Sequence, residues 1–131
     1  MTEKRPIIYV TSYFQPFGAG GAERTCKLHA EILVKSGQPV TVVTPNYGAA
    51  THEDMAGIEV VRVDIGQTLS QGKQMPEWLF DTPQVARRLK AAILDTADRQ
   101  DAVCIHAQHP AIAAAAQQAA SRLGIPFVAH I

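Results

Sequence analysis

The sequence predicts an α/β fold in which a parallel sheet carries helices on both of its faces. Short apolar runs rich in β-branched residues alternate along the chain with longer stretches in which apolar residues recur at helical spacing. Strands that alternate with helices in this way join through right-handed crossovers into a parallel sheet. The chain has 131 residues, 47% of them hydrophobic and 18% charged, which is enough for one globular domain with its own core.

Four apolar runs predict strands that are buried on both faces of the sheet. These runs share β-branched residues and flanking turn residues, and they cover 7–11, 40–44, 102–106 and 126–130. A further run, 58–65, mixes charged residues with its apolar ones. That mixture is typical of a strand at the edge of a sheet.

Three stretches between the strands predict helices. The first covers 22–36 and ends at Gly37, and its expected inward arc consists of Ala22, Cys26, His29, Ala30, Ile32 and Leu33. The second begins at Thr82 and Pro83, an N-cap and first-turn pair, and runs to about Arg99. The third, 110–123, is rich in alanine and ends before Gly124. We therefore expect a Rossmann-like sheet with close helix contacts.

Ligands of such sheets bind beside the carboxyl ends of the strands. The informative loops are therefore 12–21, 45–57 and 106–110. A long irregular stretch, 66–82, predicts either a functional segment or disorder.

Charge and cysteine content exclude several partners and compartments. Twelve basic and twelve acidic residues cancel, so net charge does not indicate a nucleic-acid partner. The two cysteines, Cys26 and Cys104, form no CxxC motif, which fits a reducing compartment. No apolar run approaches the ~20 residues of a membrane span. We expect a cytoplasmic location.

The segment "FGAGGAERT", 17–25, places glycines directly before the first predicted helix. Bare backbone N–H groups at the positive end of a helix dipole bind phosphate, whereas glycines can also simply form a tight turn. A dinucleotide fingerprint would need a glycine where Glu23 stands. Both the phosphate site and the tight turn stay open as interpretations.

Several motifs, in order, resemble the start of the GT-B glycosyltransferases of family four, the group 1 glycosyltransferases. They are "GGAE" at 20–23, "GQPVTVVTP" at 37–45, "GIEVVRV" at 57–63, "DAVCIHAQHP" at 101–110 and "GIPFVAHI" at 124–131. The resemblance implies a two-domain enzyme that transfers a sugar, as a hexosyltransferase does, from a nucleotide-sugar donor to an acceptor hydroxyl with retention at the anomeric carbon. Its pathway would be glycan, glycolipid, cell-wall or polysaccharide synthesis.

The resemblance covers only the amino-terminal, acceptor-side half of such an enzyme. We expect residues 1–131 to form a single, incomplete domain of this kind. The carboxy-terminal domain, which in the family binds the donor, has no match. A fragment without that domain is expected to be inactive.

The resemblance also assigns roles to particular residues. Gly20 and Gly21 would bring backbone N–H groups near the donor diphosphate, and His106 would reach the transferred sugar near the reaction centre. A structural histidine bonded to backbone is the alternative for His106. His109 and His130 are acceptor-side candidates on the same rim, and a helix-capping role is the alternative for His109.

Tyr13 and Phe17, in the first loop, are further acceptor-side candidates. Their rings would stack on a sugar or a lipid-linked acceptor, or else fold back over the end of the sheet. The apolar segment 76–80 lies next to Arg87, Arg88 and Lys90 in the sequence. This stretch predicts either peripheral contact with the inner face of a membrane or a solvated helix face.

No cofactor and no metal are expected, since the nucleotide sugar is a substrate. The histidines lack a carboxylate or cysteine at ligand spacing, and the family relies on helix dipoles and basic side chains for the diphosphate. Two alternative functions stay open. One is a non-catalytic acceptor-binding module or subunit, and the other is a nucleotide-binding Rossmann-like protein.

Overall fold

The strands and helices occur in the predicted order, with a hairpin strand and a short helix in addition. The computed structural model describes residues 4–14, 17, 21–49, 52–69, 75–108 and 110–129. The strands are β1 (Ile7–Val10), β2 (Val40–Pro45), β3 (His52–Met55), β4 (Ile58–Val63), β5 (Cys104–Ala107) and β6 (Phe127–Ala129). The helices are α1 (Gly21–Lys35), α2 (Pro83–Arg99), α3 (Pro110–Leu123) and the 3-10 helix η1 (Glu77–Asp81).

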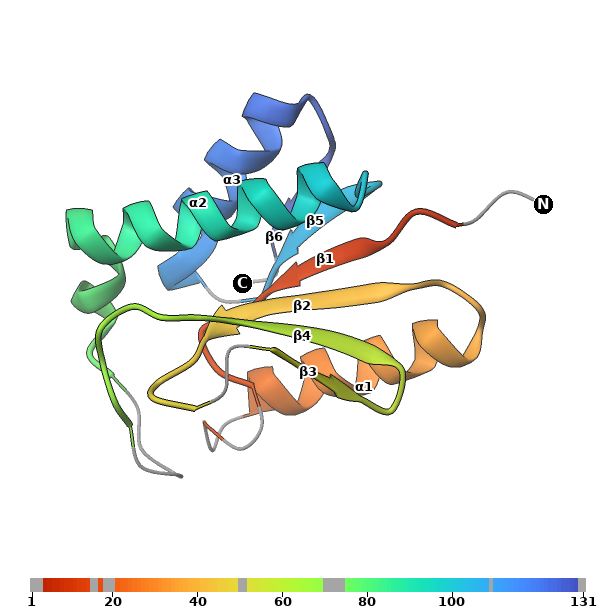
Figure 1. Ribbon diagram of the computed structural model, residues 1–131, viewed down its shortest axis with the longest axis horizontal. Helices are drawn as coiled ribbons and strands as arrows, with labels where there is room; N and C mark the ends of the chain where they lie inside the picture. Colours follow the sequence, from red (N-terminus) through yellow and green to blue (C-terminus); the bar gives the residue numbers. More distant parts are fainter. Residues whose placement is uncertain are drawn as a thin grey trace.

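The strands form one sheet in the order β3-β4-β2-β1-β5-β6. All neighbouring pairs are parallel except β3 and β4, which form an antiparallel hairpin. Helices α2 and α3 lie on one face and α1 on the other (Figure 1). The predicted α/β fold with a Rossmann-like sheet is therefore confirmed. Because the chain leaves β1 toward β2 on one side and later adds β5 on the other, the strand order reverses at β1.

The prediction that β4 is an edge strand is wrong. One edge is β3, which lies within the loop predicted over 45–57 and pairs with β4 through the turn at Ala56 and Gly57. The turn residues have φ angles of 55° and 85°, and the Gly57 N–H donates to Asp54 Oδ1 at 3.1 Å. The charged residues of β4 are paired instead of exposed, for example Glu59 Oε2 with Gln100 Nε2 at 2.7 Å. The other edge is β6, so the prediction that 126–130 is buried on both faces is also wrong, and Val128 and Ala129 are exposed.

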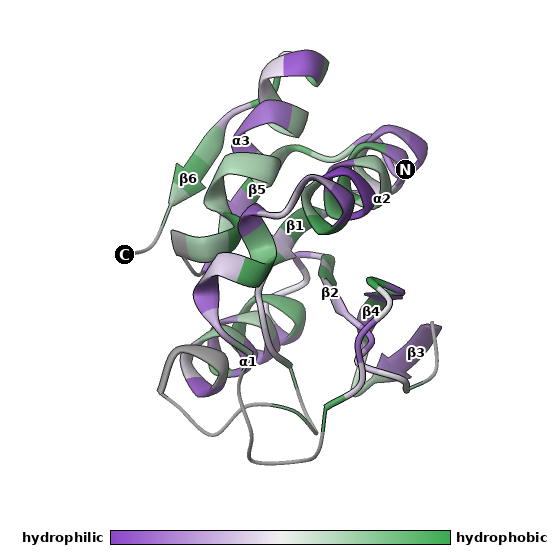
Figure 2. Ribbon diagram, turned by 90° about the vertical axis from the view of Figure 1, so that its left-hand side faces the viewer, coloured by the Kyte–Doolittle hydropathy of each residue, from purple (hydrophilic) through white to green (hydrophobic). Residues whose placement is uncertain are grey.

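Two apolar clusters fill the space between the sheet and its helices. The larger lies under α2 and α3, where Ile8, Ile93 and Ile105 are fully buried. The smaller lies under α1 and includes Tyr9 and Cys26. The hydropathy of the two edges differs, since β3 is hydrophilic and β6 is hydrophobic (Figure 2).

Helix α1 buries a narrower arc than the sequence predicts. Cys26 and Ala30 are fully buried, but Ile32 is 53% exposed. Val34 lies toward the hairpin turn, since its Cγ1 is 3.1 Å from the point that a Cβ on Gly57 would occupy. Ile32 is on the opposite flank of the helix, and no helix in the described part of the chain covers it there. The inward assignment of Ile32 is therefore wrong.

The helix ends largely follow the sequence signals. Gly37 has a φ of 91°, and the N–H of the next residue, Gln38, donates to Leu33 O at 2.9 Å, as in a Schellman cap. Thr82 occupies the N-cap position of α2, but its hydroxyl does not cap that helix. It donates to Leu79 O at 2.6 Å and so closes η1.

Candidate functional site at the carboxyl edge of the sheet

The inner strands end in polar side chains at the carboxyl edge of the sheet. We call Thr11, Thr44, Arg62 and Gln108 the polar row. Thr44 and Arg62 are register partners. The ladder continues past the strand ends, because the Thr11 N–H donates to Val43 O at 3.1 Å and the Gln108 N–H donates to Val10 O at 2.8 Å. Side chains alternate along a strand, so the row lies on the face that α1 covers.

The polar row is buried, and part of it has no hydrogen-bond partner. Exposed fractions are 1% for Thr11, 0% for Thr44 and 7% for Gln108. Thr11 Oγ1 donates to Tyr13 O at 3.0 Å. Within the described residues, Thr44 Oγ1 and Gln108 Oε1 have no partner, and neither has Oγ of Ser12, beside Thr11.

Unpaired buried polar atoms carry a cost and call for an explanation. Each one costs about 1–3 kcal/mol of desolvation that a hydrogen bond would offset. Such atoms at the carboxyl edge, where open α/β sheets bind ligands, are expected of a site that meets a polar ligand.

Arg62 brings a buried positive charge to the same edge. Its guanidinium is 0% exposed and its Nε donates to Glu53 Oε1 on the neighbouring strand β3. The guanidinium carbon also lies 6.0 Å from the centroid of the Phe17 ring. Because Arg stays protonated, this charge is permanent, and the Glu53 carboxylate is the anion that balances it.

Helix α1 begins at Gly21, so the helix starts within the predicted glycine segment. The start of a helix presents free backbone N–H groups and the positive end of the helix dipole. Gly20 lies outside the described residues. The phosphate role of both glycines stays a prediction.

His106 is the penultimate residue of β5. It precedes Gln108 by two residues, so it lies further from the carboxyl edge of the sheet than Gln108 does. Its ring is half-buried, 4.9 Å from the Tyr9 ring and inclined by 43° to it. Its catalytic role is not tested by this geometry. His109 and His130 lie outside the described residues.

Tyr13 and Phe17 belong to the core under α2 and α3. They are 3% and 7% exposed, and both rings contact Tyr47, with centroid distances of 5.6 and 5.4 Å. The Tyr13 hydroxyl accepts from the Met75 N–H at 2.7 Å. In the structure both rings fold back over the end of the sheet. The acceptor-side role of the two residues stays a prediction.

Burial of the Tyr47 hydroxyl makes the stability of the fold decrease with pH in the alkaline range. Burial, followed by the neighbouring Tyr13, raises the pKa of Tyr47 well above its ordinary value, and its hydroxyl donates to Ser12 O at 2.7 Å. The unfolded chain loses this proton near pH 10 while the folded chain keeps it, so stability falls as pH rises above about 10. Above that pH, this group lowers the free energy of unfolding by about 1.4 kcal/mol per pH unit.

Urea unfolding between pH 8 and 11 measures this slope, with Tyr47→Phe as the comparison. The variant is expected to lose part of the alkaline slope, while burial of Tyr9, whose pKa is also raised by burial, maintains the rest. Equal slopes in the two proteins would contradict the assignment.

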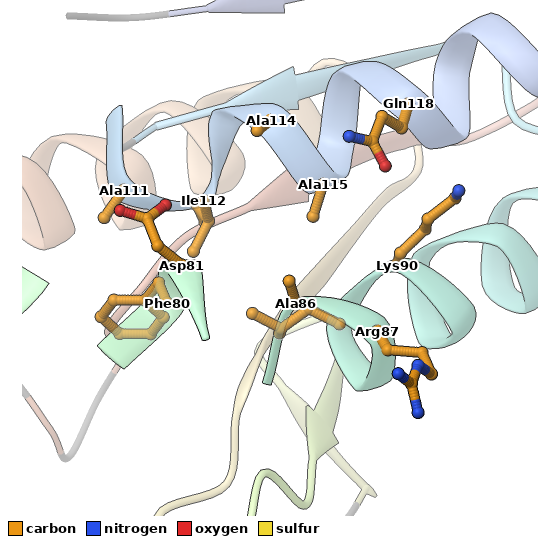
Figure 3. A pocket seen from close by; sticks show the side chains of 11 residues that line it. Phe80, Asp81, Ala86, Arg87, Lys90, Ala111, Ile112, Ala114, Ala115 and Gln118 are labelled. Carbon is orange, nitrogen blue, oxygen red and sulfur yellow. The ribbon is translucent and has the colours of Figure 1, made fainter. Parts of the chain in front are cut away.

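A hollow lies between α2 and α3 (Figure 3), and no member of the polar row lines it. It has a volume of about 380 Å³, with an apolar floor that includes Leu89 and Ile112. Its charged side chains, Asp81, Arg87 and Lys90, are at least partly exposed. Trp78 of η1 is 66% exposed. A solvated helix face and a membrane contact both stay open for this stretch.

In the part of the chain that the structure describes, no three His, Cys, Asp or Glu side chains come together as metal ligands. None of the helices there has the length and apolar character needed to span a membrane.

A mostly parallel sheet with a polar carboxyl edge is the architecture of open α/β domains, a class whose ligands bind at the topological switch point. Comparison with protein families identifies this domain more closely. The chain belongs to the glycosyl transferase 4-like domain family, whose model matches residues 20–131. No curated protein sequence matches the chain.

Solved structures similar to the chain include GT-B glycosyltransferases, as the sequence predicts. Sucrose-phosphate synthase from Thermosynechococcus elongatus is 19% identical with a TM-score of 0.69, covering 96% of this chain and 32% of that one. MurG from Acinetobacter baumannii is 15% identical with a TM-score of 0.63, and the match covers 96% of this chain and 34% of MurG. The chain thus spans about a third of the length of these enzymes.

A third similar structure has another activity in its name. The C-terminal domain of a hydrogenase from Pyrococcus furiosus is 15% identical with a TM-score of 0.62, covering 100% of this chain and 94% of that one. Likeness at this level of identity shows the fold alone. The assignment to a glycosyltransferase family therefore depends on the family match.

Thr44, Ser12 and Gln108 were not among the site residues predicted from the sequence. Each follows or ends an apolar run with a polar side chain. That pattern is the available signal, because the carboxyl ends of parallel strands meet at one edge. Histidine and glycine are more distinctive signals in a sequence, because fewer structural roles need their chemistry.

Proposed function

We propose that the chain is the amino-terminal, acceptor-side domain of a retaining glycosyltransferase of the hexosyltransferase type. Membership of the glycosyl transferase 4-like family is the observation that carries this proposal. The polar row at the switch point and the start of α1 at Gly21 support it, because they provide hydrogen-bonding groups and a helix dipole at one edge.

In this proposal the edge of the sheet faces a nucleotide-sugar donor delivered by a second domain outside this chain. The N-terminus of α1, with Gly20 and Gly21, stabilises negative charge as the nucleoside diphosphate leaves. His106 positions a sugar hydroxyl through its neutral imidazole. No metal takes part in this proposal, because the helix dipole stabilises the anion.

The acceptor is a glycan or a lipid-linked molecule in cell-wall or polysaccharide synthesis at the cytoplasmic side of a membrane. Exposed Trp78 and the partly exposed Arg87 and Lys90 support a peripheral contact there, since aromatic and basic side chains favour a membrane surface.

Turnover assays test the division into two domains. The 131-residue chain and the complete product of its gene are each incubated with UDP-glucose, UDP-N-acetylglucosamine and GDP-mannose, and nucleoside diphosphate release is measured. The complete product is expected to release the diphosphate from one donor, and the 131-residue chain from none.

Other outcomes favour the alternatives. Robust transfer by the 131-residue chain alone would overturn the two-domain assignment. A complete product that ends at Ile131 and releases nothing would favour the acceptor-binding module. Tight binding of NAD, measured by calorimetry, would favour a dinucleotide-binding protein.

A further inference from the structure

Gln108 is a buried polar side chain at the carboxyl edge, like Ser12 and Thr44, and it has the largest exposed fraction of these three. Ser12 and Thr44 are each 0% exposed, whereas Gln108 is 7% exposed. Its Oε1 has no hydrogen-bond partner in the described part of the chain. The Oε1 atom itself is buried, so a ligand satisfies it only by entering the carboxyl edge beside Gln108.

We propose that the Gln108 side-chain carbonyl accepts a hydrogen bond from a hydroxyl group of the bound sugar and so helps to select that sugar. This inference depends on the proposed glycosyltransferase function. It adds a specificity-determining residue that the sequence pattern did not single out.

The backbone holds Gln108 in a defined place. Its N–H donates to Val10 O at 2.8 Å, which extends the pairing of β5 with β1 by one residue. β1 is the strand at which the sheet order reverses, so Gln108 lies at the topological switch point. A side chain fixed there needs little reordering when a ligand binds, and this preorganisation favours binding.

The chemistry of the carboxamide fits a sugar hydroxyl. A carbonyl oxygen has two lone pairs and accepts from an O–H donor, which every monosaccharide supplies. The amide is neutral at all ordinary pH values. A contact through Gln108 is therefore independent of pH between about 5 and 8, whereas one through a histidine changes near pH 6.5.

The test compares the 131-residue chain with its Gln108→Met variant, which keeps the length of the side chain and removes the carbonyl. Thermal unfolding is measured without ligand. Binding is measured by NMR titration with the methyl glycosides of glucose, galactose, mannose and N-acetylglucosamine, each with and without UDP or GDP. Gln118→Met is the matched control, because Gln118 is an exposed glutamine of α3.

The proposal predicts opposite changes in stability and binding. Gln108→Met is expected to raise the unfolding midpoint by about 2–6 °C, because an unpaired buried carbonyl is removed. The same change is expected to weaken binding of the preferred glycoside about three- to tenfold, equally at pH 5.5 and 8. Gln118→Met should change neither quantity.

A drop in the unfolding midpoint of Gln108→Met would overturn the inference, since it would show a structural partner for the carbonyl. Unchanged glycoside binding by the variant would also overturn it while leaving the proposed function intact. If the unmodified chain binds no glycoside in the panel, with or without nucleotide, the proposed acceptor-side function fails and the inference with it.

Discussion

Replacing Phe14 with alanine is expected to lower the free energy of unfolding by about 3–5 kcal/mol. Phe14 is 1% exposed and packs between β1 and α1 with Tyr9 and Cys26. Its backbone carbonyl accepts a hydrogen bond from the Phe17 N–H at 2.9 Å. The loss is a large share of the roughly 5–15 kcal/mol that stabilises a domain.

Denaturant unfolding followed by circular dichroism measures this loss. Phe14→Leu is the control, because it keeps an apolar side chain of similar length and should cost no more than about 1.5 kcal/mol. A cost below about 1 kcal/mol for Phe14→Ala would show that the ring is not part of the core under α1.

The order of elements could be predicted because its signals are local. Apolar runs, Gly37 and Gly124 as helix stops, and Pro83 at a helix start each act within a few residues. Strand β3 was missed because its sequence, HEDM, has no apolar run, and only pairing with β4 makes it a strand. The charges of β4 suggested an edge since their partners, Glu53 and Gln100, are far from obvious in the sequence.

The candidate site was harder to predict because it depends on register and on burial. The prediction took β5 to end at His106, but the strand continues through Ala107 and pairing with β1 extends to Gln108. Alternation then places Gln108 on the same face as His106 and nearer the edge. The position of Tyr13 and Phe17 depends on how the first loop packs against Tyr47, which no local pattern encodes.

The two members of the ion pair between Glu53 and Arg62 differ in burial. Arg62 is 0% exposed in its side chain, while Glu53 is 39% exposed. Removing the carboxylate leaves a buried guanidinium that cannot lose its proton, whereas removing the guanidinium leaves a carboxylate that water can still reach.

Glu53→Gln is therefore expected to cost about 2–4 kcal/mol of unfolding free energy, and Arg62→Met about 1 kcal/mol or less. The double variant should be no less stable than Glu53→Gln alone, because the charge that lacked its carboxylate is gone. Denaturant unfolding of all the variants at pH 7 completes the cycle. A greater loss for Arg62→Met than for Glu53→Gln would mean that the stem and cation of Arg62, against Phe17, stabilise the fold more than the ion pair does.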